Sequence, residues 1–299
     1  YVDSFVIADC LRFGRINKEV YLDDYRYAAL KNLTRARFFA VQNLTREKQR
    51  FMNQLFKKYS TMAQEKVFSD TFSTTALAVY ESFESAETLA NMDLHQLTKF
   101  IIEKGKNRFP DPDSVAKAIQ KAARSSYRLP KTVNDSVNQV LSISINSMRA
   151  MESQIKAFDK AIAEQMALIP NTLTSVNGIG PVYSAGIIAE IGDINRFPNQ
   201  ASLAKYAGLV WSQHQSGDFE AQNTRLIHSG NRYLKYYLCE AAMSLVRCDA
   251  EYRSFYHRKY KEVNKYQHKR ALALTARKLV RLVFRLLKDN CLYRAPESK

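Results

Sequence analysis

The sequence lacks the grouped metal-binding side chains that a zinc site or a disulfide framework needs. Four cysteines are scattered along the chain without a C-x-x-C pair: Cys10, Cys239, Cys248 and Cys291. The five histidines show no metal-ligand spacing either. We therefore interpret the cysteines as reduced, small core residues rather than as disulfide partners or zinc ligands.

Long apolar runs are also absent. No segment reaches the roughly eighteen consecutive apolar residues of a transmembrane helix, and no signal peptide is recognisable. Hydrophobic residues still make up 46% of the chain, enough for a packed core. These features favour a soluble, cytoplasmic protein that does not bind membranes.

Acidic residues are few compared with basic ones. The chain has 45 Lys and Arg against 29 Asp and Glu, which gives a net charge of +16. Such a balance favours a polyanionic partner, and nucleic acid is preferred over the rival, a membrane surface.

Helical patterns dominate the first half, and the fold class we predict is mainly α. Residues 23–66 contain no proline or glycine and carry apolar residues at coiled-coil spacing. Residues 71–127 indicate a compact helical insert. It is interrupted at Pro110 and Pro112, after which Asp113 or Ser114 could cap a helix.

The clearest heptad lies between Val133 and Ile169. Apolar residues recur at strict sevens, at Leu141, Met148, Ile155, Ile162 and Ile169. Together with 23–66 it predicts a long antiparallel coiled coil. Its apolar seam has two interpretations that the sequence leaves nearly even: an intramolecular packing pair, or an arm that forms a homodimer or homotetramer, which we slightly favour.

Two glycines, Gly178 and Gly180, flank Ile179 and are followed by Pro181. Glycine permits a tight turn, and proline suits the first turn of a new helix, whose free amides can hold a phosphate oxygen. The spacing suggests a helix-hairpin-helix that binds the DNA backbone without reading sequence. On the two glycines alone, an ordinary corner between two core helices is the better interpretation.

A polar segment follows, and it carries a candidate nucleophile. Ser216 precedes Gly217, and Gly230-Asn231-Arg232-Tyr233-Leu234-Lys235 then opens an apolar helix. An isolated Ser-Gly is usually a turn serine. Here, however, several motifs follow one another: the glycine turn, Ala207-Gly208-Leu209, Ser216-Gly217 and the motif from Gly230 to Lys235. This order favours a functional role for Ser216 over a turn serine.

This order resembles the C-terminal domain of insertion-sequence transposases of the IS110 type, relatives of the Piv invertase. The resemblance implies that Ser216 is the nucleophile. It also implies nucleic-acid contacts by residues of the turn and of the segment after the serine, namely Gly178, Gly180, Arg225, Asn231, Arg232 and Lys235. Lys235 stands where the family usually has arginine, so the charge is kept but bidentate phosphate contact is lost.

The family also has a RuvC-like α/β domain in which four acidic residues bind metal. Asp3-Ser4-Phe5-Val6-Ile7-Ala8 matches the last of those acids, so the resemblance implies that Asp3 is catalytic and binds Mg²⁺. The other three acids would precede Tyr1, and we expect the sequence to start within that domain, as an N-terminally truncated chain. Such a metal site needs several carboxylates, so this chain alone would be inactive.

Basic residues concentrate near the C-terminus. From Tyr252 to Asp289 there are twelve Lys and Arg against Glu262 and Asp289, a net of about +10 by this count. A charge run is usually only a solvated face, but the charge of the whole chain favours phosphate contact here. We predict that Arg258, Lys259, Lys269 and Arg270 bind nucleic acid.

Three segments result: residues 1–22 as the end of a RuvC-like domain, 23–169 as a coiled-coil arm with a helical insert, and 170–299 as a C-terminal transposase domain. The resemblance implies a prokaryotic, nucleoid-associated enzyme that cuts and rejoins DNA at insertion-sequence ends, guided by a structured non-coding RNA. The acid–metal cluster that activates the serine could come from another protomer. Two alternatives stay open: a Piv-like site-specific invertase, and a non-catalytic helix-hairpin-helix nucleic-acid-binding protein.

Replacing Arg258, Lys259, Lys269 and Arg270 with glutamine tests the basic segment. We expect weaker nucleic-acid binding, because phosphate contacts are lost. Each lost contact should also make the plot of log affinity against log salt shallower, by roughly one unit of slope. Titrations at several salt concentrations measure this slope. An unchanged slope would assign the basic run to a solvated face.

Overall fold

The computed structural model describes residues 2–15, 24–65, 67–212, 215–216, 219–220 and 225–294. Nearly all of its regular structure is helical, with one small β-ribbon among the described residues, so the mainly α prediction is confirmed. The chain divides into two compact units. Residues 36–160 form one, and residues 1–35 together with 161–299 form the other. The three-segment division drawn from the sequence remains a prediction.

The unit of residues 36–160 is built on two long helices, α2 (Tyr25–Lys58) and α8 (Lys131–Met166), which both extend beyond it. Short helices connect them: α3 (Ser60–Gln64), α4 (Thr74–Ser82), α5 (Ala86–Asn91), α6 (Leu94–Gly105) and α7 (Pro112–Arg124). Asp111 caps α7 by accepting a hydrogen bond from the Ser114 amide, and Pro112 fills the first helical position. The cap therefore lies before the proline, not at Asp113 or Ser114 as the sequence suggested, because proline needs no amide partner there.

Within this unit α2 and α8 run antiparallel. The ion pairs Arg37–Asp159 and Lys48–Glu152 join early residues of one helix to late residues of the other. Leu141 and Met148 share an apolar core with Phe51 and Leu55. This part of the heptad seam is thus buried within one chain, which favours the intramolecular interpretation. Assembly through the coil remains a prediction.

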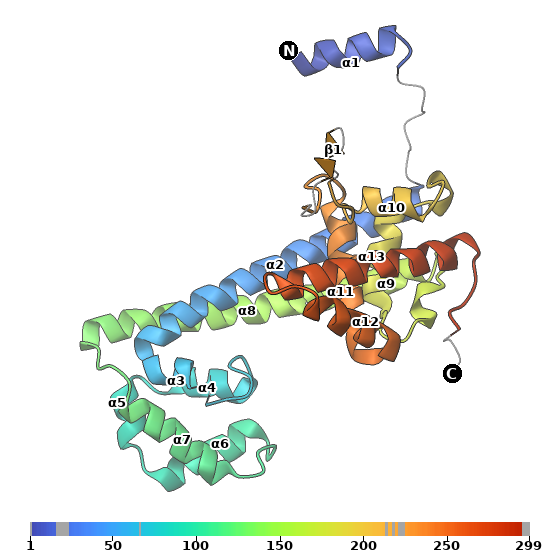
Figure 1. Cartoon of the computed structure of the whole chain (residues 1–299). Helices are drawn as coiled ribbons and strands as arrows, with labels where there is room; N and C mark the ends of the chain where they lie inside the picture. The colour runs from blue at the N-terminus through green and yellow to red at the C-terminus, as the bar shows by residue number, and fades with distance from the viewer. Residues whose placement is uncertain are drawn as a thin grey trace. The chain divides into compact units, whose positions relative to one another are not determined.

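The other unit is organised around α11 (Arg232–Cys248), which packs against α9 (Pro181–Ile191), α12 (Ala250–Lys261) and α13 (Gln267–Lys288) (Figure 1). Shorter elements complete it: the 3-10 turns η1 (Leu173–Ser175) and η2 (Ile194–Arg196), helix α10 (Gln200–Tyr206), and strands β1 (Gln215–Ser216) and β2 (Phe219–Glu220). The Tyr237 hydroxyl on α11 donates to the Thr34 carbonyl, 2.7 Å away. This bond fastens the beginning of α2 to the unit.

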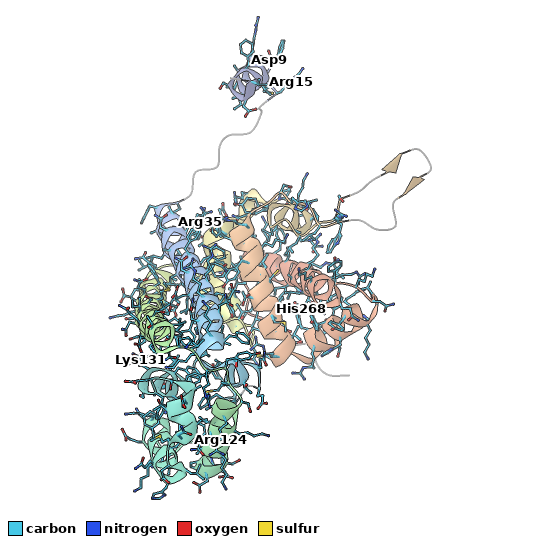
Figure 2. All side chains as sticks on the ribbon, turned by 90° about the vertical axis from the view of Figure 1, so that its left-hand side faces the viewer. Asp9, Arg15, Arg35, Arg124, Lys131 and His268 are labelled. Atoms are coloured by element: carbon cyan, nitrogen blue, oxygen red, sulfur yellow. The ribbon has the colours of Figure 1, made fainter. Side chains whose placement is uncertain are left out.

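Helix α1 (Val2–Arg12) is the first element of the chain. None of its residues is buried, and Figure 2 shows its side chains, with Asp9 labelled, together with Arg15 just beyond it. Phe5 and Leu11 are among its exposed apolar side chains. No helix of the described residues combines the length and apolarity that a membrane crossing requires.

The two interpretations of the heptad seam predict different outcomes for the substitution Met148→Asp. Met148 is 2% exposed, so a carboxylate there is costly to bury. We expect the midpoint of thermal unfolding and the helical circular-dichroism signal to fall, because the substitution unfolds the helices. The oligomer mass measured by light scattering should stay the same. Ile143→Asp is the control, since Ile143 lies on the same helix and is 59% exposed. If Met148→Asp keeps its helicity and light scattering shows a smaller oligomer, the seam is a subunit contact.

Candidate functional site around the Ser216 ribbon

Ser216 lies on a β-ribbon. Strand β1 pairs antiparallel with β2, with Ser216 opposite Phe219 and Gln215 opposite Glu220. The same pairing direction is present at the base of the ribbon, where Trp211 bridges Leu226. There the Ser212 amide donates to the Arg225 carbonyl at 2.8 Å, and the Ile227 amide donates to Val210 at 3.0 Å. The side chain of Ser216 lies outside the described part of the structure.

Two glycines close the ribbon at its base. Gly208 and Gly230 both have positive φ, at 68° and 116°. A Cβ on Gly230 would meet the Gly208 backbone nitrogen at 2.6 Å, and a Cβ on Gly208 would meet the Ser229 carbonyl oxygen at 2.7 Å. Only glycine combines this backbone geometry with so close an approach. The contact fixes where the two strands leave the helical unit.

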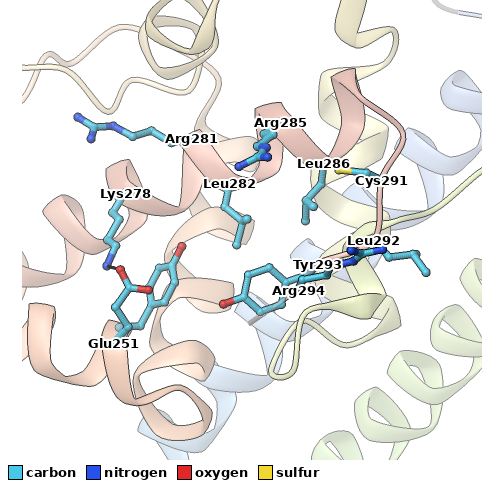
Figure 3. A pocket seen from close by; sticks show the side chains of 11 residues that line it. Glu251, Lys278, Arg281, Leu282, Arg285, Leu286, Cys291, Leu292, Tyr293 and Arg294 are labelled. Atoms are coloured by element: carbon cyan, nitrogen blue, oxygen red, sulfur yellow. Dashed lines mark hydrogen bonds and ion pairs between the residues drawn. The ribbon is translucent and has the colours of Figure 1, made fainter. Parts of the chain in front are cut away.

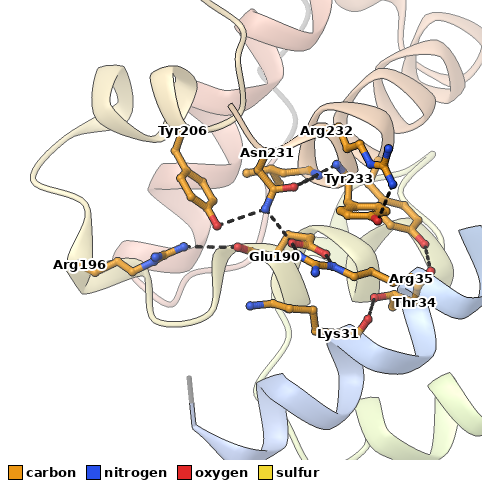
Figure 4. Close-up of polar contacts among 11 residues, drawn as sticks. Lys31, Thr34, Arg35, Glu190, Arg196, Tyr206, Asn231, Arg232 and Tyr233 are labelled. Carbon is orange, nitrogen blue, oxygen red and sulfur yellow. Dashed lines mark hydrogen bonds and ion pairs between the residues drawn. The ribbon is translucent and has the colours of Figure 1, made fainter. Parts of the chain in front are cut away.

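Beside this closure lies a buried carboxylate, Glu190, with no exposed side-chain surface (Figure 4). The Arg35 guanidinium donates two hydrogen bonds to this carboxylate, from Nε to Oε1 at 2.7 Å and from Nη2 to Oε2 at 2.8 Å. The Asn231 amide donates to Oε2 at 2.7 Å. Hydrogen bonding to Glu190 also raises the pKa of Arg35. A bidentate, charge-assisted pair of this kind offsets the cost of burying the charge.

Asn231 links this cluster to both the ribbon and α11. Its side-chain oxygen caps α11 by accepting from the amides of Tyr233 and Leu234, both at 3.0 Å. Its amide nitrogen donates to the Tyr206 hydroxyl at 3.1 Å as well as to Glu190. All four bonds are made within the protein. Asn231 is therefore placed to position the ribbon, and its predicted contact with nucleic acid is untested.

Sequence reasoning missed Arg35 and Glu190. Glu190 is the one acid in the apolar helix α9, whose residues from Ser184 onward are all buried. An acid that folding must bury needs a partner, so this position carried a usable signal. Arg35 gave none, because it lies 155 residues away among many other basic residues of α2.

The predicted glycine turn has only part of the expected geometry. Gly178 has a positive φ of 105°, and Pro181 occupies the first turn of α9, as the sequence indicated. Gly180 is exposed with open space around it. The segment before the turn is the single 3-10 turn η1, not an α-helix, so the helix-hairpin-helix is not confirmed.

The predicted basic residues have different surroundings. Lys259 and Arg270 both bind Glu262, at 2.6 and 2.9 Å. Arg258 and Lys269 are exposed, as is Arg225. Arg232 is exposed too, and it donates to the Tyr233 hydroxyl at 2.8 Å, whereas Lys235 is half-buried.

A basic pocket lies between α12, α13 and the chain that follows α13 (Figure 3). Lys278, Arg281, Arg285 and Arg294 line it, together with Tyr252 and Tyr293. Lys278 is held by Glu251 at 2.6 Å. Burial raises the pKa of Tyr252, so this phenol stays neutral and cannot add negative charge.

Asp3 lies in the first turn of α1 and is exposed. The part of the chain that the structure describes contains no group of three or more His, Cys, Asp or Glu that could hold a metal ion. Asp3 with its described neighbours therefore does not fit a divalent-metal site.

Two family models match separate segments of the chain. Residues 171–257, which contain the ribbon and its base, match the model of the transposase IS116/IS110/IS902 family. Residues 1–59 match a transposase model of the IS110 DEDD type. Both matches point to the same family, the IS110-type transposases.

Curated relatives agree with this assignment. An "Insertion element IS110 uncharacterized 43.6 kDa protein" of Streptomyces coelicolor is 32% identical over 48% of this chain and 34% of its own length. The IS116 protein of Streptomyces clavuligerus is 26% identical over 97% of this chain and 71% of its own length. A "Probable family 20 transposase" of Pseudomonas aeruginosa is 31% identical over 33% of this chain. Two of the three alignments thus span about a third or less of the relative, 34% and 28%.

The substitution Asn231→Asp tests the buried cluster. It keeps the cap oxygen but replaces the amide donor beside Glu190 with a second carboxylate. At neutral pH we expect a loss of about 3 kcal/mol in the free energy of unfolding. Protonation of a carboxyl group removes the repulsion between the two carboxylates, so the penalty should be smaller at acidic pH than at neutral pH. Urea unfolding at neutral and acidic pH measures it.

Asn199→Asp is the matched control. Asn199 also caps a helix, α10, through bonds from the amides of Ala201 and Ser202, and it is exposed. A carboxylate at this helix start should be neutral or mildly stabilising. Equal destabilisation by both substitutions would show that Glu190 does not act on Asn231 as described.

Proposed function

We propose that this chain carries the serine nucleophile of a DNA transposase that cuts and rejoins DNA at insertion-sequence ends and targets. The proposal rests on two findings that concern the same segment of the chain. The family match over residues 171–257 covers the same residues that build the anchored ribbon on which Ser216 lies. The closure by Gly208 and Gly230 and the Glu190 cluster support a fixed mounting for that ribbon.

The proposed chemistry is two successive transesterifications. The Ser216 hydroxyl oxygen attacks the scissile phosphorus, a P–O bond to serine forms, and the bond from phosphorus to one deoxyribose oxygen breaks. The serine proton passes to a base, and the departing oxygen takes up a proton. A hydroxyl of the joining strand then attacks the same phosphorus and releases the serine. Because one phosphate ester replaces another, the bond energy is conserved.

The support for a divalent metal comes from the similarity to the IS110-type transposases. The DEDD-type match over residues 1–59 suggests metal dependence, and Asp3 is the residue we propose as a ligand. Mg²⁺ is the ion implied by the resemblance. Since the described residues do not assemble such a site, the further carboxylates must lie outside them.

The remaining parts of the proposal concern partners. The charge of +16 supports binding of a polyanion. We propose DNA as the substrate and a structured guide RNA as a second ligand, with phosphate contacts from Gly180 at the start of α9 and from the basic residues of α12 and α13. A homodimer or homotetramer remains part of the proposal, as do the coiled coil and the helix-hairpin-helix. A Piv-like invertase would use the same residues, and genomic context separates the two: mobile-element ends or an invertible segment.

Ser216→Ala tests the nucleophile. In a protein that also contains the family's other metal-binding acids, we expect strand exchange to be abolished while nucleic-acid binding is retained, because no other hydroxyl at this place can form the covalent link. A protein–DNA adduct trapped on the wild-type protein should map to Ser216 by mass spectrometry. Alanine variants of Ser212, Thr224 and Ser229 are the controls and should keep most activity. An adduct on a tyrosine, or full activity of Ser216→Ala, would overturn the mechanism.

Asp3→Ala tests the proposed metal ligand separately. In a protein that also contains the other metal-binding acids, it should abolish strand exchange through lost metal binding, so isothermal titration with Mg²⁺ should show weaker binding by the variant. Asp9→Ala, on the same exposed helix, should behave as wild type. Equal Mg²⁺ affinity of wild type and Asp3→Ala would remove Asp3 from the proposal.

A further inference from the structure

A groove runs alongside the base of the Ser216 ribbon. Trp211, Arg225 and Leu226 of the ribbon form one wall. The other wall is formed by the turn between α12 and α13 and by the first part of α13, and it includes Glu262, Lys265, Tyr266, Lys269 and Arg270. We call this the ribbon-side groove. It is distinct from the Glu190 cluster, and both of its walls belong to the same compact unit.

The ribbon-side groove is basic. Four cationic residues, Arg225, Lys265, Lys269 and Arg270, face one acid, Glu262, so the lining carries a net charge of about +3 by this count. Glu262 is already paired with Lys259 and Arg270, whose hydrogen bonds lower its pKa. Among the described residues neither Lys265 nor Lys269 forms an ion pair. These lysines are available to the phosphates of a ligand.

Tyr266 stands at the rim of the groove in a conformation that folding alone does not explain. Its backbone is left-handed, with φ 54° and ψ 28°, which is unfavourable for a bulky residue. Its side chain is 79% exposed, so the ring gains little from packing. Its position caps α13 without any side-chain bond to the helix. Strained backbone and an aromatic ring left in water are features of a ligand-binding position.

Trp211 supplies a second aromatic ring on the opposite wall, and it is half-buried. Ser216 lies five positions after Trp211 in the sequence. An extended chain of that length spans at most about 18 Å. The ribbon-side groove is therefore close enough to Ser216 for one DNA strand to contact both.

We propose that the ribbon-side groove binds an unpaired stretch of the DNA strand that Ser216 cuts, with Tyr266 stacking on a base and Arg225, Lys265 and Lys269 contacting phosphates. Identifying the strand as the one that is cut rests on the function proposed above. Stacking on an exposed ring requires the open face of a base, which a continuous duplex does not offer. The groove thus selects DNA opened beside the cleavage point.

The test compares three labelled oligonucleotides of one sequence: single-stranded DNA, blunt duplex DNA and single-stranded RNA. Fluorescence anisotropy gives the affinity of each for the wild-type protein and for Tyr266→Ala. We expect Tyr266→Ala to bind single-stranded DNA about tenfold more weakly, since one stacked base is lost, and to bind duplex nearly as well as wild type. Tyr266→Phe keeps the ring and should restore binding.

The chain contains a single tryptophan, which provides a direct probe of the groove. Single-stranded DNA should change the fluorescence of Trp211 in the wild-type protein, and duplex should change it less. Tyr127→Ala is the matched control, because Tyr127 is 72% exposed and lies in the other compact unit. It should bind all three oligonucleotides as wild type does.

Tyr266→Gly separates binding from folding. Glycine relieves the left-handed strain, so this variant should unfold at a higher temperature than Tyr266→Ala while binding single-stranded DNA as weakly. Lys265→Gln with Lys269→Gln should lower the salt slope for single-stranded DNA by roughly two. Repeating the titrations with Ser216→Ala should give wild-type binding, so failure of the nucleophile and failure of the groove are distinguishable.

Three outcomes would overturn the proposal. Wild-type affinity of Tyr266→Ala for single-stranded DNA would remove the stacking residue. An equal loss for duplex would show that the ring does not select an open strand. Tighter binding of the RNA than of the DNA, with the same dependence on Tyr266, would make the occupant RNA.

Discussion

The burial of the Glu190 carboxylate is the constraint on which the Ser216 site depends. A carboxylate without exposed surface is stable only when opposite charge and hydrogen bonds surround it. Arg35 supplies the charge from α2, and Asn231 supplies the amide from the start of α11. Because α9 carries the carboxylate itself, this one group ties together three helices that are distant in sequence. Loss of Arg35 would leave the charge uncompensated, and loss of Asn231 would remove one hydrogen bond from the carboxylate.

The position of the ribbon follows from that cluster. Asn231 directly follows Gly230, so fixing Asn231 also fixes the glycine contact with Gly208. The backbone N–H of Asn231 donates a hydrogen bond to the Tyr206 carbonyl at 2.7 Å, and the Asn231 side-chain amide donates to the Tyr206 hydroxyl. Both strands of the ribbon therefore start from one anchored point. A nucleophile needs defined placement relative to a phosphate. Here rigidity at the base is supplied by groups that themselves need not touch DNA.

Part of this organisation was predictable because it is local. Heptad spacing and the absence of proline and glycine predicted α2 and α8, and Gly178 with Pro181 predicted a turn and a helix start. The cap of α7 was misplaced, because Asp111 and Asp113 flank the same proline and short-range pattern does not rank them. The segment before Gly178 was expected to be a helix, but it is a single 3-10 turn. Boundaries depend on neighbours that a local pattern does not include.

The sequence by itself determined the mainly helical fold, the basic charge and, through its motifs, the resemblance to IS110-type transposases with Ser216 as candidate nucleophile. Periodicity, composition and short motifs are properties of adjacent residues. Tertiary structure alone decided that the heptad residues Leu141 and Met148 share a core with α2, and that Glu190 pairs with Arg35 across 155 positions. It also brought Trp211, Arg225 and Tyr266 onto one groove. These pairings arise from packing between distant segments, where many arginines or apolar residues are equivalent in sequence and only the fold selects which one lies within contact distance.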